Sequence, residues 1–205
     1  MVIQICCDDA QWAEITSSVS SGMFNRVDRP NMFDDKADAY MQLSDELPAS
    51  FHRNKPYFIN AVIQTLQEIH ASDNVLRINA WPGFLQQPRW EFAGIISASA
   101  ERVFAALGKI AVPVADRPGL VTARVIAMVI NEAYYALGEQ ISSKAEIDTA
   151  MKYGTNYPFG PFEWAEKIAL RRVYELLNRL SLGQKRYVPA ELLVKEALHE
   201  SDSSH

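Results

Sequence analysis

The chain contains 205 residues, of which 48% are hydrophobic and 22% are charged, and its formal net charge is -5 at pH 7. These values are typical of soluble globular proteins with one large or two small domains. They exclude a nucleic-acid-binding protein, because no basic stripe is present to neutralise phosphates. The sequence has no apolar run of membrane-spanning length, and its first residues lack the basic and apolar regions of a signal peptide. We therefore expect a cytoplasmic protein that makes no membrane contact.

The two cysteines, Cys6 and Cys7, are adjacent in the sequence. Neighbouring side chains of a strand point to opposite faces, so the pair is not expected to share a metal or to form a disulfide. A reactive thiol needs a cationic neighbour, whereas Asp8 and Asp9 follow directly and would raise the thiol pKa. We expect two small strand residues in a reducing compartment, and no metal site.

The first half of the chain alternates short apolar runs with stretches of helical periodicity. The pattern predicts strands at residues 2–7, 37–43, 75–80 and 110–114, and helices at residues 9–19, 56–70 and 98–107. Pro56 favours a helix start, and the apolar residues after it recur at helical spacing. Residues 20–30 are rich in turn formers, and Gly108 stands where a helix would end. This alternation indicates an α/β fold with a mainly parallel sheet.

The second half is predicted to be entirely helical. The pattern predicts helices at residues 119–141, 143–154, 161–183 and 189–199. Ser143 and Glu146 make a capping box at the start of the second of these helices, and we expect Gly154 to end it. The predicted organisation is an α/β domain at residues 1–114, a helical domain at 115–200 and a disordered tail at 201–205.

Two motifs in the helical half have a specific order and spacing. Residues 146–154 read Glu-Ile-Asp-Thr-Ala-Met-Lys-Tyr-Gly, and residues 157–163 read Tyr-Pro-Phe-Gly-Pro-Phe-Glu. They resemble the Asp-x-Ala-Met-x-x-Gly and Pro-x-Gly-Pro-Phe-Glu motifs in the helical substrate and dimerisation domain of the 3-hydroxyacyl-CoA dehydrogenase family. The resemblance extends to the Asp-Arg-Pro-Gly turn at 116–119 and to Asn-Glu-Ala at 131–133. It implies a truncated Rossmann-like α/β domain followed by the family's helical C-terminal domain.

The same resemblance implies a role in fatty-acid metabolism, an acyl-CoA ligand, and a homodimer in which Val125, Met128 and Val129 could be shared. NAD is implied as the cofactor by the family alone. Family members bind its pyrophosphate through Gly-x-Gly-x-x-Gly after the first strand. Here residues 6–11 read Cys-Cys-Asp-Asp-Ala-Gln, so glycine is missing and two carboxylates stand where an anion would bind. We expect a degenerate nucleotide site.

The family's proton-transfer residues are also incomplete in this sequence. The resemblance places a catalytic His in a His-Phe-Phe-Asn-Pro segment, but the corresponding residues 81–85 read Trp-Pro-Gly-Phe-Leu. No histidine lies between His70 and His199, and the family's Asn corresponds to Ala123. Glu91 falls near the place of the family's Glu and is the catalytic candidate, with a structural role as the alternative.

The candidate residues for an acyl cleft are aromatic or lie in rigid turns. They are Trp81, Phe84, Asn131, Tyr157, Pro158, Phe159, Gly160 and Pro161. Each has a packing alternative, because aromatic rings also fill space beneath loops and a proline-glycine turn also sets the angle between helices. His52 is either a relocated base or a solvated loop residue. Two functions stay open: a diverged 3-hydroxyacyl-CoA dehydrogenase-like enzyme, and a non-catalytic dimeric module that binds acyl-CoA or a partner protein.

Overall fold

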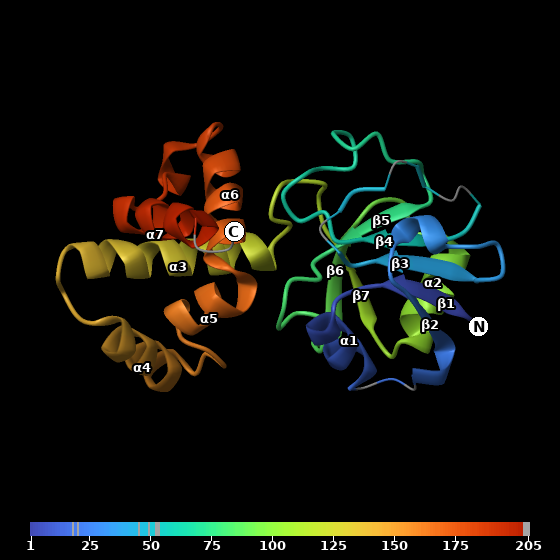
Figure 1. Ribbon diagram of the computed structural model, residues 1–205, viewed down its shortest axis with the longest axis horizontal. Coiled ribbons are helices and arrows are strands. Elements are labelled where there is room, and N and C mark those ends of the chain that lie inside the picture. Colours follow the sequence, from blue (N-terminus) through green and yellow to red (C-terminus); the bar gives the residue numbers. More distant parts are fainter. Residues whose placement is uncertain (18, 20, 45, 49, 52–53, 203–205) are drawn as a thin grey trace. The chain divides into compact units, whose positions relative to one another are not determined.

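The computed structural model describes residues 1–17, 19, 21–44, 46–48, 50–51 and 54–202. The chain divides into two compact units, Met1–Leu120 and Val121–His205. Figure 1 shows that the first unit contains the strands and that the second is helical. In the part of the chain that the structure describes, no helix has both the length and the apolar character needed to cross a membrane.

The first unit is built on a seven-stranded sheet with the order β2-β1-β3-β4-β5-β6-β7. Its strands are β1 (Ile3–Cys6), β2 (Phe24–Val27), β3 (Ala39–Gln42), β4 (Tyr57–Ile59), β5 (Val75–Ile78), β6 (Arg89–Ala93) and β7 (Ile110–Pro113), and its helices are α1 (Asp9–Thr16) and α2 (Ala98–Ala106). Short 3-10 turns, η1 (Ser21–Met23) and η2 (Pro30–Met32), flank β2. All neighbouring strands are parallel except β5 and β6. The prediction of a mainly parallel sheet is confirmed.

The two faces of the sheet are covered differently. On one face, buried strand residues such as Ile5 and Phe58 pack with Ile15 of α1 and Phe104 of α2. On the other face, buried residues such as Tyr57 pack against side chains from connecting segments, among them the following partly buried ones: Phe51, Leu66, Ile69 and Ala71. Helices therefore cover one face, and ordered loops cover the other.

The predicted helix at 56–70 is wrong. Tyr57–Ile59 forms the central strand β4, in which all three side chains are buried, and residues 60–70 form turns. A strand buried on both faces reads as a continuous apolar run, which periodicity cannot distinguish from a helix. The sequence pattern predicted neither β2 nor β6. Strand β2 is a short edge strand with exposed Asn25 and Arg26, so it has no continuous apolar run.

The strand order changes direction at β1, which pairs with β2 on one side and with β3 on the other. In open α/β sheets of this type, ligands bind beyond the carboxyl ends of the strands at such a switch point. The segment that follows β1, from Cys7 into α1, therefore lies where the fold would position a nucleotide.

The second unit consists of α3 (Thr122–Gly138), α4 (Lys144–Thr155), α5 (Pro161–Ile168), α6 (Leu170–Ser181), η3 (Lys185–Tyr187) and α7 (Glu191–Asp202). The capping box of Ser143 and Glu146 is present at the start of α4. Gly154 does not end that helix, because α4 continues to Thr155 and Asn156 adopts the left-handed conformation after it. Residues 203–205 of the predicted disordered tail lie outside the described residues.

The helix predicted over 161–183 is two helices. The break falls at Ala169, whose φ of +75° is unfavourable for a residue with a Cβ atom. Both sides of the break are buried: Ile168 ends α5 and Leu170 begins α6, with relative exposures of 0% and 3%. Burial of these two side chains fixes a bend that helical periodicity alone does not reveal.

Candidate functional site

The N-terminus of α1, at the switch point of the sheet, is capped by the chain itself. The Gln11 backbone N–H donates to Asp8 Oδ1 at 2.7 Å, and the Asp8 N–H donates to Gln11 Oε1 at 3.2 Å. The buried Gln11 amide then donates to the carbonyls of Leu43 and Ala80 at 2.7 and 3.0 Å. The capping box thus satisfies the first turn of the helix and ties it to the segments after β3 and β5.

The neighbouring residues neutralise the second carboxylate without forming an anion site. Arg26 on β2 donates to Asp9 Oδ1 at 2.7 Å and to the Cys7 carbonyl at 3.0 Å. Hydrogen bonding to Asp9 raises the pKa of Arg26, so the guanidinium is charged and engaged. The Arg26 guanidinium carbon lies 5.5 Å from the centre of the Trp12 ring, within cation–π range.

The two thiols at this position are poor nucleophiles. Burial raises the pKa of Cys7 to about 11, and burial also raises the pKa of Cys6. Both thiols are therefore protonated at neutral pH, which agrees with the structural role predicted for them. Among the described residues, no cluster of His, Cys, Asp and Glu side chains is arranged to hold a metal ion.

The residues at the α1 N-terminus do not fit the pyrophosphate of NAD. A phosphate bound there would accept hydrogen bonds from the first N–H groups of the helix. One of these groups, the N–H of Gln11, already donates to the Asp8 carboxylate. The side chain of Asp8 would also face the phosphate with like charge. Residues 6–11 include no glycine, so each of them carries a side chain. These side chains would keep the backbone away from the pyrophosphate of a dinucleotide, which must approach it closely.

A cavity that sequence reasoning missed lies in the loops after β2 and β3. It has a volume of about 550 Å³ and is lined by Arg29, Pro30, Asn31, Phe33, Glu46, Leu47, Pro48 and Ser50. Its charged members have opposite sign, and its apolar members are mainly prolines and Phe33. The only sequence signal for it is the turn-forming composition of the two segments.

The segment that carries Trp81 and Phe84 is fixed by backbone hydrogen bonds. Glu14 of α1 accepts from the N–H groups of Gly83 and Leu85 at 2.5 and 3.3 Å. Trp81 is 2% exposed, whereas Phe84 is half-buried. Within this unit Trp81 therefore packs in the interior, and a role for either ring in an acyl cleft stays a prediction.

The loop that leads from this segment into β6 is held by a buried lysine. The Lys109 ammonium donates to the carbonyls of Leu85 and Gln87 at 2.8 and 3.0 Å, and it lies 5.2 Å from the centre of the Trp90 ring. Burial lowers the pKa of Lys109. The Trp90 indole donates to the same Leu85 carbonyl at 3.0 Å. These contacts use Lys109 as a structural cation.

Glu91 lies on β6 and is buried, with 9% of its surface exposed. Its neighbours Trp90 and Phe92 belong to the core that contacts α2, so Glu91 points to the opposite face of the sheet. Burial lowers the pKa of Arg77 on β5, and the charges of Asp116 and Glu91 act against that shift. Asp116 is thus the main partner of the buried cation and Glu91 adds a smaller effect, and the catalytic role of Glu91 stays a prediction.

Arg77 is fully buried and holds the last segment of the first unit. It forms an ion pair with Asp116, and its Nε donates to the Ala61 carbonyl at 2.7 Å. Further bonds from the guanidinium reach the carbonyls of Val62 and Arg117 at 3.1 and 3.3 Å. In the described part of this unit the only histidine is His70, which is exposed, and His52 lies outside the described residues.

The Asp-x-Ala-Met and Gly-Pro-Phe-Glu motifs form one structural corner between α4 and α5. Asp148 of α4 accepts from the backbone N–H groups of Phe162 and Glu163 at 2.8 and 3.3 Å. A Cβ atom added to Gly160 would lie 2.3 Å from the Asp148 carboxyl carbon, so only glycine fits there. Glu163 accepts from the Gly160 N–H at 2.9 Å and pairs with Lys152.

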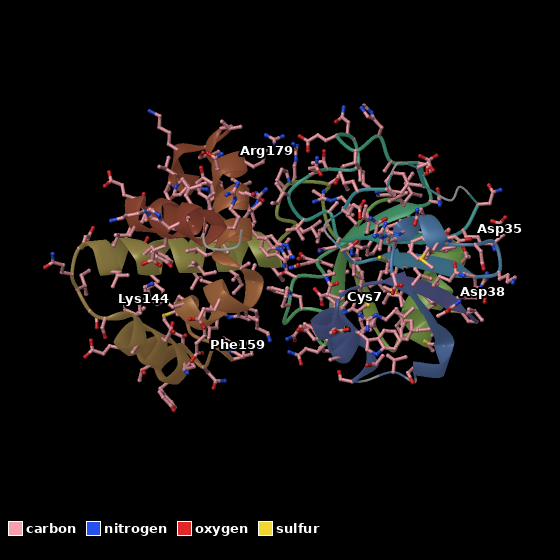
Figure 2. The ribbon with its side chains drawn as sticks, in the orientation of Figure 1. Cys7, Asp35, Asp38, Lys144, Phe159 and Arg179 are labelled. Carbon is pink, nitrogen blue, oxygen red and sulfur yellow. The ribbon has the colours of Figure 1, made fainter. Side chains whose placement is uncertain are left out.

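The remaining candidate residues also have contacts within the second unit. Figure 2 shows Phe159 near α5, and its ring centre lies 4.9 Å from that of Trp164. Asn131 is 2% exposed; its amide donates to the Val188 carbonyl at 2.9 Å and accepts from the Ala190 N–H at 2.8 Å. Tyr157 is half-buried and Pro158 is exposed. Helix packing accounts for Asn131, while cleft roles for all of them stay predictions.

The comparisons with known proteins centre on the helical unit. The family model of the 3-hydroxyacyl-CoA dehydrogenase C-terminal domain matches residues 119–201. The helical unit is therefore similar to the C-terminal domain of the 3-hydroxyacyl-CoA dehydrogenase family. Its similarity to 3-hydroxyadipyl-CoA dehydrogenase of Escherichia coli is 44% identity over 46% of this chain and 20% of that protein. A probable 3-hydroxybutyryl-CoA dehydrogenase of Bacillus subtilis is 41% identical over 43% of this chain and 32% of its own length.

Comparison with solved structures extends the similarity of fold into the first unit. The 3-hydroxybutyryl-CoA dehydrogenase of E. coli K12 matches 72% of this chain and 32% of its own with 33% identity and a TM-score of 0.60. FadB2 of M. tuberculosis matches 97% of this chain and 94% of its own with a TM-score of 0.76 and 13% identity. The predicted fold, a Rossmann-like domain followed by the family's helical domain, is confirmed. The matches to these two curated relatives span only 20% and 32% of those proteins.

Proposed function

We propose that this chain is a 3-hydroxyacyl-CoA dehydrogenase-like protein of fatty-acid metabolism that binds acyl-CoA and lacks the family's usual NAD-dependent hydride transfer. The observation that carries the proposal is the capping box at α1, in which the Asp8 carboxylate accepts from a backbone N–H that a bound phosphate would use. The acyl-CoA ligand is supported by the relatives, whose names specify 3-hydroxybutyryl-CoA and 3-hydroxyadipyl-CoA substrates.

The loss of hydride transfer is supported by the residues that stand in place of the family's proton-transfer groups. Trp81 replaces the catalytic histidine, and an indole N–H donates a hydrogen bond but cannot accept the hydroxyl proton. Ala123 replaces the asparagine; it is 0% exposed and has no polar side chain. Glu91 is present, but it lies on the face of the sheet that carries the buried Arg77. In the family the Glu acts by orienting the catalytic histidine, so without that histidine Glu91 has no base to orient.

The alternative function is a non-catalytic dimeric module that binds acyl-CoA or a partner protein. This alternative is supported by the contacts of the candidate residues, which have structural roles that need no catalysis. Asn131, Asp148 and Gly160 all have packing or capping roles within the helical unit. A helical unit with these features keeps its fold without any catalytic requirement.

Ligand titration tests acyl-CoA binding and the loss of NAD binding. The full chain is titrated by calorimetry with NADH and, separately, with 3-hydroxybutyryl-CoA, and an active family dehydrogenase serves as the positive control. We expect heat of binding with the acyl-CoA and none with NADH. Binding of neither ligand would refute acyl-CoA binding and favour the protein-interaction module.

A turnover assay tests the loss of hydride transfer directly. Oxidation of 3-hydroxybutyryl-CoA is followed by NADH absorbance at equal concentrations of this chain and the control enzyme. We expect a rate at least about a thousandfold below the control, since the base and cofactor groups each contribute about 100-fold or more. A rate equal to that of the control enzyme would refute the proposed loss of hydride transfer.

A further inference from the structure

The cavity in the loops after β2 and β3 lies at the edge of the sheet where this type of fold places its ligands. Strands β2 and β3 are the two neighbours of β1 and run parallel to it, so their carboxyl ends flank the switch point. In open α/β sheets, ligands bind beyond this end of the strands. The cavity volume of about 550 Å³ lies within the range of small-molecule sites. Position and size both indicate a ligand site.

The wall of the cavity that follows β2 is held by buried residues. The Cys6 thiol donates to the Asp28 carbonyl at 3.6 Å, where the wall begins. Phe33, directly after η2, is 7% exposed and lines the cavity. Its ring centre lies 5.3 Å from that of Tyr40 and 5.8 Å from that of Tyr57. The position of this wall is thus set by the aromatic core on that face of the sheet.

The wall that follows β3 is anchored to the same tyrosine. Gln42, the last residue of β3, is buried; its amide donates to the Glu46 carbonyl and accepts from the Tyr57 hydroxyl at 2.7 Å. Tyr57 therefore contacts the first wall directly and the backbone of the second wall through Gln42. Pro30 and Pro48, one in each wall, restrict the local backbone. The chain forms the cavity by itself, which lowers the ordering cost of binding a ligand.

Two opposite charges line this cavity without neutralising each other. Arg29 and Glu46 are both exposed, and among the described residues neither side chain has a hydrogen-bond or ion-pair partner. A ligand with one negative charge would be repelled by Glu46, and a ligand with one positive charge would be repelled by Arg29. An uncharged ligand would leave both side chains without a partner. A ligand that carries charges of both signs complements the cavity.

We propose that this cavity binds a zwitterion of the α-amino-acid type, a free amino acid or a dipeptide with an apolar side chain. The ligand carboxylate pairs with Arg29, whose guanidinium can donate two parallel hydrogen bonds to it. The ligand ammonium pairs with Glu46, and the apolar side chain packs on Phe33 and the prolines. A dinucleotide fits less well, because the capping box at α1 occupies the place of its pyrophosphate. This site goes beyond acyl-CoA binding and does not depend on it.

Ligand analogues that lack one charge test the two pairings. Calorimetry of the full chain gives the dissociation constants of leucine, leucylleucine, N-acetylleucine, leucinamide and adenosine. N-acetylleucine lacks the ammonium and leucinamide lacks the carboxylate, so each should bind at least about tenfold more weakly than leucine. The tighter of leucine and leucylleucine identifies the source of the zwitterion. Adenosine binding that is tighter than both would overturn the proposal.

Neutral variants assign the binding to this cavity. Arg29→Gln and Glu46→Gln should each weaken leucine binding by about tenfold. Arg29→Gln should also remove the difference between leucine and leucinamide, and Glu46→Gln the difference between leucine and N-acetylleucine, because the partner of the missing charge is gone. Arg89→Gln and Glu101→Gln, at exposed positions of β6 and α2, are the matched controls and should leave the constants unchanged.

Urea unfolding confirms that each variant is folded, so that a loss of binding reports on the cavity. Absence of binding by both leucine and leucylleucine would overturn the proposal. So would binding of either compound that is unchanged in both Arg29→Gln and Glu46→Gln. The outcome is independent of the acyl-CoA titration, because that titration uses a different ligand and the proposed amino-acid site lies in the first unit.

Discussion

Replacement of Asp148 by alanine should destabilise the helical unit by about 2–3 kcal/mol. The carboxylate of Asp148 accepts from the N–H groups of Phe162 and Glu163 in the first turn of α5. Loss of a helix-capping acceptor costs about 1 kcal/mol. The Phe162 N–H is buried, so leaving it without a partner adds about 1–3 kcal/mol. The long 3.3 Å bond to the Glu163 N–H contributes little, so we expect a loss in the lower half of the roughly 2–4 kcal/mol that the two contributions give together.

Urea unfolding followed by circular dichroism at 222 nm measures this effect, because the second unit is entirely helical. Hydrogen exchange of the α5 amides assigns the loss to the α4–α5 corner rather than to the first unit. Asp148→Asn is the matched control: it keeps a side-chain oxygen acceptor at the same position and should lose about half as much. A loss below about 0.5 kcal/mol for Asp148→Ala would refute the capping role of this carboxylate.

Two further predictions concern the same unit. Ala169→Gly should raise the free energy of unfolding by about 1 kcal/mol, because glycine adopts a φ of +75° without steric cost. Ala150→Gly, inside α4, should lower it by about the same amount. If urea titration gave changes of the same sign for both variants, this reasoning would be contradicted. Burial acts to raise the pKa of Glu196, but hydrogen bonds from Lys144 and Tyr134 outweigh it and lower that pKa. A carboxylate with a lowered pKa stabilises the fold above its unfolded pKa and loses that contribution as pH falls below about 4.5 toward its folded value. Glu196→Gln should therefore have a flatter stability profile between pH 5 and pH 3 than wild type, and parallel profiles would refute this role.

The elements that the sequence predicted correctly depend on local signals. Strands β1, β3, β5 and β7 are compact apolar runs, and the start of α4 carries a capping box within four residues. The errors occurred where tertiary contacts override local pattern. Residues 57–59 are apolar at helical spacing with their neighbours, but they pair with strands on both sides and form β4. The bend at Ala169 depends on burial of the residues beside it.

The candidate site was predictable in part. The missing glycines and the carboxylates after β1 could be read from the sequence, because they lie directly after the first predicted strand, where the family has its glycine-rich loop. The cavity lined by Arg29 and Glu46 was not predictable, since it forms between two loops that follow different strands. The role of Arg77 was also hidden, because its partner Asp116 lies 39 residues away.

The sequence by itself determined the family of the helical unit and the absence of the glycine-rich loop, because both are properties of short segments with fixed spacing. Only the tertiary structure decided how these segments are used. It showed that Asp8 caps α1 together with Gln11, and that Asp148 caps a helix that begins 13 residues after it. It also showed that Val125 and Tyr135 of α3 stay exposed. Such outcomes depend on contacts between distant residues, and a local pattern does not specify those contacts.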